Sequence, residues 1–165
     1  MISFSSSQDN VFNNITLPLQ RLSRSIAVSI GEFSLLLVCC NSIAQQQQIF
    51  SSLKGLCPAD ITEIILPSSA ESLYTHIVHT FGSTQPEAVM VRGLESVEAI
   101  DQLIISTNVM RDELRSQFKF PLILCINDEI LRKLVWLAPD LKNWAANTIR
   151  FDSPNQSLGQ QSLSA

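Results

Sequence analysis

The feature that most limits how this chain can fold is a nearly unbroken apolar segment over residues 33–40, interrupted only by Ser34. A short apolar run of this kind, entered after Gly31 and left through a polar turn, is typical of a strand buried on both faces at the centre of a parallel sheet. Parallel sheets bind their ligands at the carboxyl ends of the strands. We therefore expect any binding site to lie at the sheet edge that follows Cys40.

The turn that leaves this strand has the wrong composition for holding phosphate. Residues 41–48 read Asn-Ser-Ile-Ala-Gln-Gln-Gln-Gln and contain neither glycine nor lysine. Glycines allow successive backbone N–H groups to close around a phosphate, and a lysine supplies the charge. The sequence thus predicts a sheet of the nucleotide-binding type without the loop that grips the nucleotide.

Strand-like and helix-like segments alternate along the rest of the chain. The predicted strands cover residues 33–40, 61–66, 88–91, 121–126 and 148–151. The predicted helices cover residues 17–26, 42–55, 70–81 and 97–118, with a break near Thr107-Asn108, and a further helix that follows Asn127-Asp128 and breaks at Pro139. Helix caps are expected at Ser42, at Ser68 or Ser69, and at Asn127 or Asp128. This alternation predicts an α/β three-layer sandwich with a mainly parallel sheet of about five strands.

The length of 165 residues suits one domain. We predict a flexible N-terminal arm over residues 1–16, a single α/β domain over 17–151, and a Ser/Gln-rich linker or tail over 152–165. A linker in that position is typical of the first domain of a larger protein.

Composition limits the partners. The formal net charge of -4 argues against nucleic acid, whose binding depends on clustered Lys and Arg. No apolar run approaches the length of about 20 residues needed to span a membrane.

The four cysteines, at positions 39, 40, 57 and 125, form no C-x-x-C pair, which predicts buried free thiols in a reducing, cytoplasmic setting. An apolar content of 45% against 16% charged residues predicts surface covered by another protein, a downstream domain of the same chain, or a second copy in a homo-oligomer.

Three segments of the domain carry a family resemblance: residues 31–41, residues 110–115 before 120–124, and residues 137–144 before 149–151. On these segments, residues 33–151 resemble a degenerate P-loop-NTPase-like domain, related to the AAA+ and STAND groups, that stands at the N-terminus of bacterial and especially cyanobacterial multidomain proteins carrying tetratricopeptide repeats. The resemblance implies a P-loop-like fold without a functional P-loop.

The residues that nucleotide hydrolysis would need are mostly missing at the positions that the resemblance implies. Ser42 is all that remains of the phosphate loop, and the strand that should end in a metal-binding carboxylate is followed by Arg92, which would repel Mg²⁺. Glu95 is the nearest candidate for the catalytic carboxylate. Asn127 stands where related ATPases place a polar sensor. Ser42, Glu95 and Asn127 are therefore the candidate nucleotide contacts, and we predict neither a bound cofactor nor a metal site.

Two groups of polar and aromatic residues are candidates for contacts with partners. Glu95 and Asn127 could line a pocket at the carboxyl edge of the sheet together with Arg111 and Arg115. The alternative is that Glu95 and Asn127 cap helices and that the arginines pair with Asp112, with Glu113 or with solvent. The corner at Pro139 holds the second group, which is Trp136, Asp140 and Trp144, and an exposed tryptophan there would mark a protein-binding surface.

These observations favour a non-catalytic protein-interaction or regulatory domain over an enzyme. The alternative is an ATPase or GTPase domain whose missing phosphate contacts come from another domain or subunit. A third hypothesis is a small-molecule enzyme at the same sheet edge, which would need ionisable groups with shifted pKa values clustered there. No residue is predicted to be catalytic.

Overall fold

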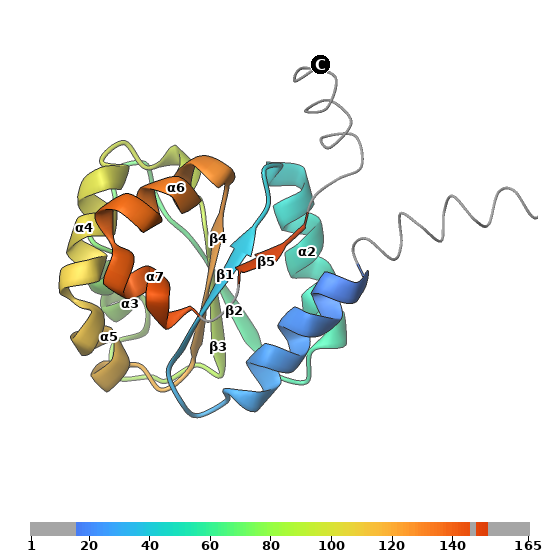
Figure 1. Ribbon diagram of the computed structural model, residues 1–165. Helices are drawn as coiled ribbons and strands as arrows, with labels where there is room; N and C mark the ends of the chain where they lie inside the picture. Colours follow the sequence, from blue (N-terminus) through green and yellow to red (C-terminus); the bar gives the residue numbers. More distant parts are fainter. Residues whose placement is uncertain (1–15, 146–147, 152–165) are drawn as a thin grey trace, which may run out of the picture.

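The fold is known from a computed structural model that describes residues 16–145 and 148–151 (Figure 1). The chain begins with a helix over residues 16–28. The elements that follow are β1 (Ser34–Cys39), α2 (Ile43–Leu56), β2 (Ile61–Ile65), α3 (Leu73–Phe81), β3 (Ala88–Arg92), the 3₁₀ turn η1 (Leu94–Ser96), α4 (Ile100–Val109), α5 (Arg111–Gln117), β4 (Pro121–Ile126), α6 (Asp128–Leu137), α7 (Pro139–Trp144) and β5 (Thr148–Arg150). The predicted arm and linker lie outside the described residues, apart from residue 16.

The five strands form one parallel sheet in the order β2-β3-β4-β1-β5. The predicted α/β class and parallel sheet are confirmed. The prediction that residues 33–40 form the central strand is wrong, because β4 lies at the centre and β1 lies beside the edge strand β5. All six residues of β4 are buried, whereas Ser34 and Leu36 of β1 are half-buried. The reason is that β5 pairs only with residues 37–39 of β1.

Helices cover both faces of the sheet, which makes three layers (Figure 1). The helix over residues 16–28 and α2 pack on one face, where Leu22, Ile26 and Leu53 are fully buried. The helices α3 to α7 pack on the other face, around residues such as Ile77 and Leu114. Strand side chains alternate between the two faces, so both must be apolar, and this accounts for the continuous apolar runs in the sequence.

Side-chain caps begin several of the helices. Ser42 and Asn127 cap α2 and α6 as predicted, through Gln45 N at 3.3 Å and Ile130 N at 2.8 Å. The cap predicted at Ser68 or Ser69 is wrong, since α3 begins later and Ser72 caps it. The carbonyl of Ser68 accepts a hydrogen bond from the Glu98 backbone N–H, at 3.0 Å, and this contact holds the chain in a turn before the helix starts.

The helix predicted over residues 97–118 is interrupted, as expected, although the break falls at Met110 rather than at Thr107-Asn108. Tertiary contacts hold this break. The side-chain oxygen of Asn108 accepts from the Leu141 backbone N–H at 3.0 Å, and the Arg111 guanidinium donates to the Asn108 carbonyl at 2.7 Å. The first bond ties the junction of α4 and α5 to α7, and the second lies within the junction itself.

All four cysteines are buried and none is in a disulfide, as predicted. Within residues 16–145 and 148–151, every helix is too short or too polar to traverse a lipid bilayer.

Candidate functional site

The connections of the sheet reverse direction between β1 and β4. The chain leaves β1 through α2 on one face, and it leaves the neighbouring β4 through α6 and α7 on the other. In open α/β sheets the crevice beyond such a switch point is where ligands bind. Cys39 and Ile126 are paired at this edge, and the polar residues Asn41 and Asp128 follow them.

Asp128 is the centre of a hydrogen-bonded cluster that spans this crevice. The Asn41 side chain makes two bonds, donating from Nδ2 to Asp128 Oδ2 and accepting from the Asp128 backbone N–H, both at 2.9 Å. Arg150 Nη1 donates to Asp128 Oδ1 at 2.8 Å, and the Cys39 thiol donates to the same oxygen at 3.3 Å. We call these four residues the Asp128 cluster. It fastens β1, β4 and β5 together at the position where a phosphate loop would have to open.

The Asp128 cluster leads to a prediction of how the stability of the protein changes as the pH falls. The hydrogen bond from Arg150, followed by the one from Asn41, lowers the pKa of the Asp128 carboxyl below its ordinary value of 3.8. A carboxyl with a depressed pKa adds stability that is complete above the unfolded-state value and is lost as the pH falls through the folded-state value. We therefore expect Asp128→Asn to destabilise the protein clearly near neutral pH and much less at a pH below the lowered pKa of the Asp128 carboxyl, as measured by urea unfolding.

Asp60→Asn is the matched control for that experiment, because Asp60 is exposed and its carboxylate pairs with no cation in the described part of the chain. Equal destabilisation by Asp128→Asn at both pH values would show that the ionised carboxylate contributes nothing.

Two of the three candidate nucleotide contacts are used for structure. The Ser42 hydroxyl oxygen and the side-chain oxygen Oδ1 of Asn127 both accept hydrogen bonds from backbone N–H groups as helix caps. Phosphate would have to displace a cap, which costs about 1 kcal/mol of stability. The interpretation of Asn127 as a helix cap is therefore confirmed, and the acceptor oxygen of each side chain is already used inside the fold.

A second polar group lies on the α2 face of the same edge. Arg92, at the end of β3, is buried and donates to Glu63 Oε2 of β2 at 2.8 Å. Cys125 of β4 is close enough for both charges to act on its thiol. Burial raises the pKa of this thiol well above its usual range, and the nearby Arg92 only partly opposes that shift. Cys125 is thus held protonated, which removes it as a nucleophile.

Glu95 is the candidate that keeps an unused group. It lies in η1, and its Oε2 atom is buried with no hydrogen-bond partner among the described residues. Gln46, in the first turn of α2, also has a buried oxygen, Oε1, without a hydrogen-bond partner among the described residues. Its Nε2 atom donates to the Cys40 carbonyl at 3.3 Å. Buried polar atoms of this kind are rare in native proteins. The predicted helix-cap role of Glu95 is wrong, because α4 begins at Ile100 after an Ala99 cap without a side-chain bond.

The structure divides the pocket that the sequence assembled from Glu95, Asn127 and the two arginines. Arg111 and Arg115 lie on α5, which leads into the start of β4 at the opposite edge of the sheet (Figure 1). Arg115 pairs there with Asp112 at 3.6 Å, as the alternative interpretation predicted. Arg111 pairs instead with Asp140 of α7, at 3.7 Å, which that interpretation did not name.

Four of the five predicted interaction residues meet at this opposite edge. Arg115 lies 4.8 Å above the Trp144 ring, and Arg111 lies beside Asp140 at the start of α7. Trp144 is half-buried and packs edge-on against Phe33, with ring centroids 6.3 Å apart. The fifth residue, Trp136, is on α6 and is 83% exposed. An indole this exposed contributes little to folding, so it is the clearest candidate for contact with a partner.

Asn41, Asp128 and Arg150 were missed as a group by sequence reasoning. Asn41 directly follows a predicted strand, Asp128 lies two residues after one, and Arg150 is the last residue but one of a third, so polar residues near strand ends were a usable signal. What was missing was the order of the strands, because only the pairing of β1 with both β4 and β5 brings these residues together. Glu63 was missed for the same reason, since its bond to Arg92 runs diagonally across the β2–β3 pair, in which Glu63 lies opposite Met90.

Comparisons of this chain with protein-family models, with curated proteins and with solved structures give no match. The fold and the geometry of the site define the protein as a parallel α/β domain in which side chains of the Asp128 cluster bridge the switch point between β1 and β4.

Proposed function

We propose that this chain is a non-catalytic protein-interaction or regulatory domain, a pseudo-NTPase that acts within a larger cytoplasmic protein. The observation that carries the proposal is the Asp128 cluster, in which Asn41 links the end of β1 to Asp128 after β4. Binding of a nucleoside triphosphate would need backbone N–H groups and a cationic side chain turned toward the space beyond the ends of β1 and β4. Here the side chains of the turn bond one another instead.

Two further observations support the proposal. The strand order, read from the other edge as β5-β1-β4-β3-β2, is the order of AAA+-related P-loop domains, which agrees with the family resemblance. In addition, Trp136 and Val135 are adjacent on α6 and both are largely exposed. Exposed aromatic residues are enriched where proteins bind one another.

The test is isothermal calorimetry of ATP and of GTP with Mg²⁺ on the purified chain, combined with a phosphate-release assay. We expect neither nucleotide to bind at micromolar concentration and no phosphate to be released above the rate of buffer alone. Micromolar affinity together with Mg²⁺-dependent turnover would overturn the proposal.

Glu95 favours a second candidate, an ATPase or GTPase domain that another domain or subunit completes. Its buried, unpartnered Oε2 has the chemistry of a group that orients a water molecule or binds a metal. On this hypothesis Glu95→Gln abolishes nucleotide hydrolysis by the full-length protein and leaves thermal unfolding of the isolated domain nearly unchanged. Unchanged hydrolysis would eliminate the second candidate.

A further inference from the structure

A pocket of about 310 Å³ lies at the edge of the sheet where β3 and β4 begin. Its walls are the second half of α3, the loop from α3 to β3, and the chain that joins α5 to β4. It is lined by Tyr74, Ile77, Val78, Phe81, Gly82, Ser83, Thr84, Gln85, Gln117, Phe118 and Phe120. We call it the aromatic pocket. The Asp128 cluster lies at the opposite edge, because it follows the ends of β1 and β4.

Neighbouring rings form much of the wall of the aromatic pocket. Three of the chain's eight phenylalanines and its single tyrosine line it. Tyr74 stacks on Phe118 with ring centroids 5.6 Å apart, and Phe118 lies 5.2 Å from Phe120. Phe120 in turn meets Phe81 edge-on at 6.3 Å. These distances are typical of favourable aromatic pairs. Phe118 and Phe120 are buried, whereas Tyr74 and Phe81 are half-buried and offer ring surface to a ligand.

Hydrogen bonds fix the loop that forms the rim of the aromatic pocket. The Gln85 side chain donates from Nε2 to the Gln117 carbonyl at 3.0 Å, and its Oε1 accepts from the Lys119 backbone N–H at 3.1 Å. The Thr84 backbone N–H donates to the Phe81 carbonyl at 3.0 Å. Gln85 thus joins the α3–β3 loop to the chain that leads into β4. Because the two walls are already connected, a ligand would not have to order them.

None of the residues that line the aromatic pocket is charged. The hydroxyl groups of Tyr74, Ser83 and Thr84 make no hydrogen bond to any residue that the structure describes, so they can bond a ligand. Moving a charged group into such a site would remove its hydration without supplying an opposite charge. The lining therefore favours an uncharged ligand that carries one or two polar groups.

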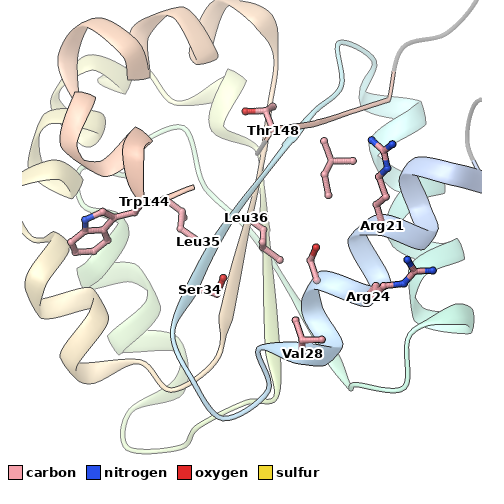
Figure 2. A pocket seen from close by; sticks show the side chains of 10 residues that line it. Arg21, Arg24, Val28, Ser34, Leu35, Leu36, Trp144 and Thr148 are labelled. Carbon is pink, nitrogen blue, oxygen red and sulfur yellow. The ribbon is translucent and has the colours of Figure 1, made fainter. Parts of the chain in front are cut away.

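The larger groove shown in Figure 2 has a different chemistry. Its volume is about 660 Å³, and Arg21 and Arg24 are among its lining residues. Guanidinium groups suit anions, for which the aromatic pocket has no counterpart. The groove is also lined by Trp144 and Thr148, and the chain between these two includes residues 146–147, which lie outside the described part. No ligand is therefore assigned to that groove.

The volume of the aromatic pocket indicates a small ligand. It is near the lower end of the range of about 300–1,000 Å³ that is usual for ligand pockets. An apolar cavity of about 150 Å³ holds benzene. The aromatic pocket thus has room for two fused rings with a small substituent. A single aromatic side chain of a partner protein would fill only about half of it.

We propose that the aromatic pocket binds a small, uncharged aromatic molecule of one ring or two fused rings that carries a hydroxyl or N–H group. Its rings pack against Tyr74 and Phe81, and its polar group bonds one of the hydroxyl groups of the lining. This inference goes beyond the proposed function, because it gives the domain a ligand at a site remote from the Asp128 cluster and does not depend on that cluster.

Titration of the ¹⁵N-labelled full chain with indole and with 2-naphthol, followed through amide chemical shifts, tests the proposal. We expect shift changes concentrated at residues 82–85 and 117–120, with a dissociation constant below about 1 mM for both probes. The 2-naphthoate ion carries a negative charge on the same fused rings. It should bind at least about tenfold more weakly than 2-naphthol, because the lining offers no cation.

Two variants and a control test where the probes bind. Val78→Phe adds a ring on the pocket side of α3 and should weaken binding of 2-naphthol at least about tenfold. Val135→Phe is the matched control: it makes the same substitution at a largely exposed position of α6, outside the pocket, and should bind like wild type. Tyr74→Leu keeps an apolar side chain but removes a ring, and should weaken binding at least about threefold. It decides the question if the amide spectrum shows that Val78→Phe does not fold.

Several outcomes would overturn the proposal. These are shifts that do not saturate, shifts located outside residues 74–85 and 117–120, 2-naphthoate binding as tightly as 2-naphthol, and folded pocket variants that bind like wild type. A dimer in sedimentation that excludes both probes would overturn it too, since the pocket would then be an interface between copies. Nucleotide calorimetry reports on the other edge of the sheet, so ATP turnover would reject the proposed function whether or not indole binds.

Discussion

Replacing Gly93 with alanine should lower the free energy of unfolding by about 2–4 kcal/mol, the largest loss that we expect from adding a single methyl group. Gly93 has φ of +90° at the turn from β3 into η1, a conformation that residues with a side chain rarely adopt. The added Cβ would lie 3.0 Å from the Leu66 carbonyl oxygen and 3.1 Å from the Leu66 nitrogen. Both neighbours are backbone atoms, and the Leu66 N–H is itself bonded to the Arg92 carbonyl, so neither can move cheaply.

Gly55→Ala is the control. Gly55 lies in α2, and a Cβ there meets no atom within 4 Å. Because alanine favours helix over glycine, this change should raise the free energy of unfolding by about 0.5–1 kcal/mol. Chemical denaturation of the two variants measures the difference. If the Gly93→Ala variant were as stable as the Gly55→Ala variant, the result would contradict the close approach of the Gly93 turn to the Leu66 backbone.

Removing the charge of Arg92 should have the second large effect. Arg92 is buried beside Glu63, and Arg92→Met leaves a partly buried carboxylate without its cation. Breaking one side of such a pair costs about 3 kcal/mol, whereas replacing both sides with apolar residues of similar size is often nearly neutral. The double variant Glu63→Leu/Arg92→Met should therefore recover most of the stability that Arg92→Met loses. Urea unfolding of wild type, both single variants and the double variant gives the coupling energy directly.

An exposed ion pair provides the comparison. Lys133 Nζ lies 2.6 Å from Asp101 Oδ1, closer than the Arg92–Glu63 pair, yet the two side chains are 29% and 56% exposed. Solvent screens such a pair, so Lys133→Met should cost only a small fraction of the loss caused by Arg92→Met. A comparable loss from both variants would show that burial is not what makes the Arg92–Glu63 pair important.

The Arg92–Glu63 pair also changes how the missing metal carboxylate is interpreted. Sequence reasoning treated Arg92 as a charge that would repel Mg²⁺. In the structure its guanidinium is bonded to Glu63, and Arg92 faces the α2 side of the sheet next to Cys125. The residue therefore acts as part of a buried ion pair that joins β2 to β3.

Local sequence patterns were sufficient to predict most helices and strands, but they predicted poorly which residues meet at the candidate site. Ser42 and Asn127 were predicted as caps because a cap depends on residues within one helical turn. The start of α3 was misplaced, since the turn before it is held by a bond between Ser68 and Glu98, which the local sequence does not reveal. One of the two interpretations placed Arg111 and Arg115 at the wrong edge of the sheet. The local sequence does not indicate toward which end of the sheet a helix residue projects.

The amino-acid sequence alone determined that this protein is a parallel α/β sheet covered by helices, because apolar runs and helical periodicity act over a few neighbouring residues. Tertiary structure decided which strands are neighbours, and therefore that Asn41 meets Asp128 across 87 positions of the chain. It also decided that aromatic rings of α3 and of the chain before β4 line one pocket. Both outcomes depend on strand order and register, which arise from packing between distant segments and have no counterpart in local composition.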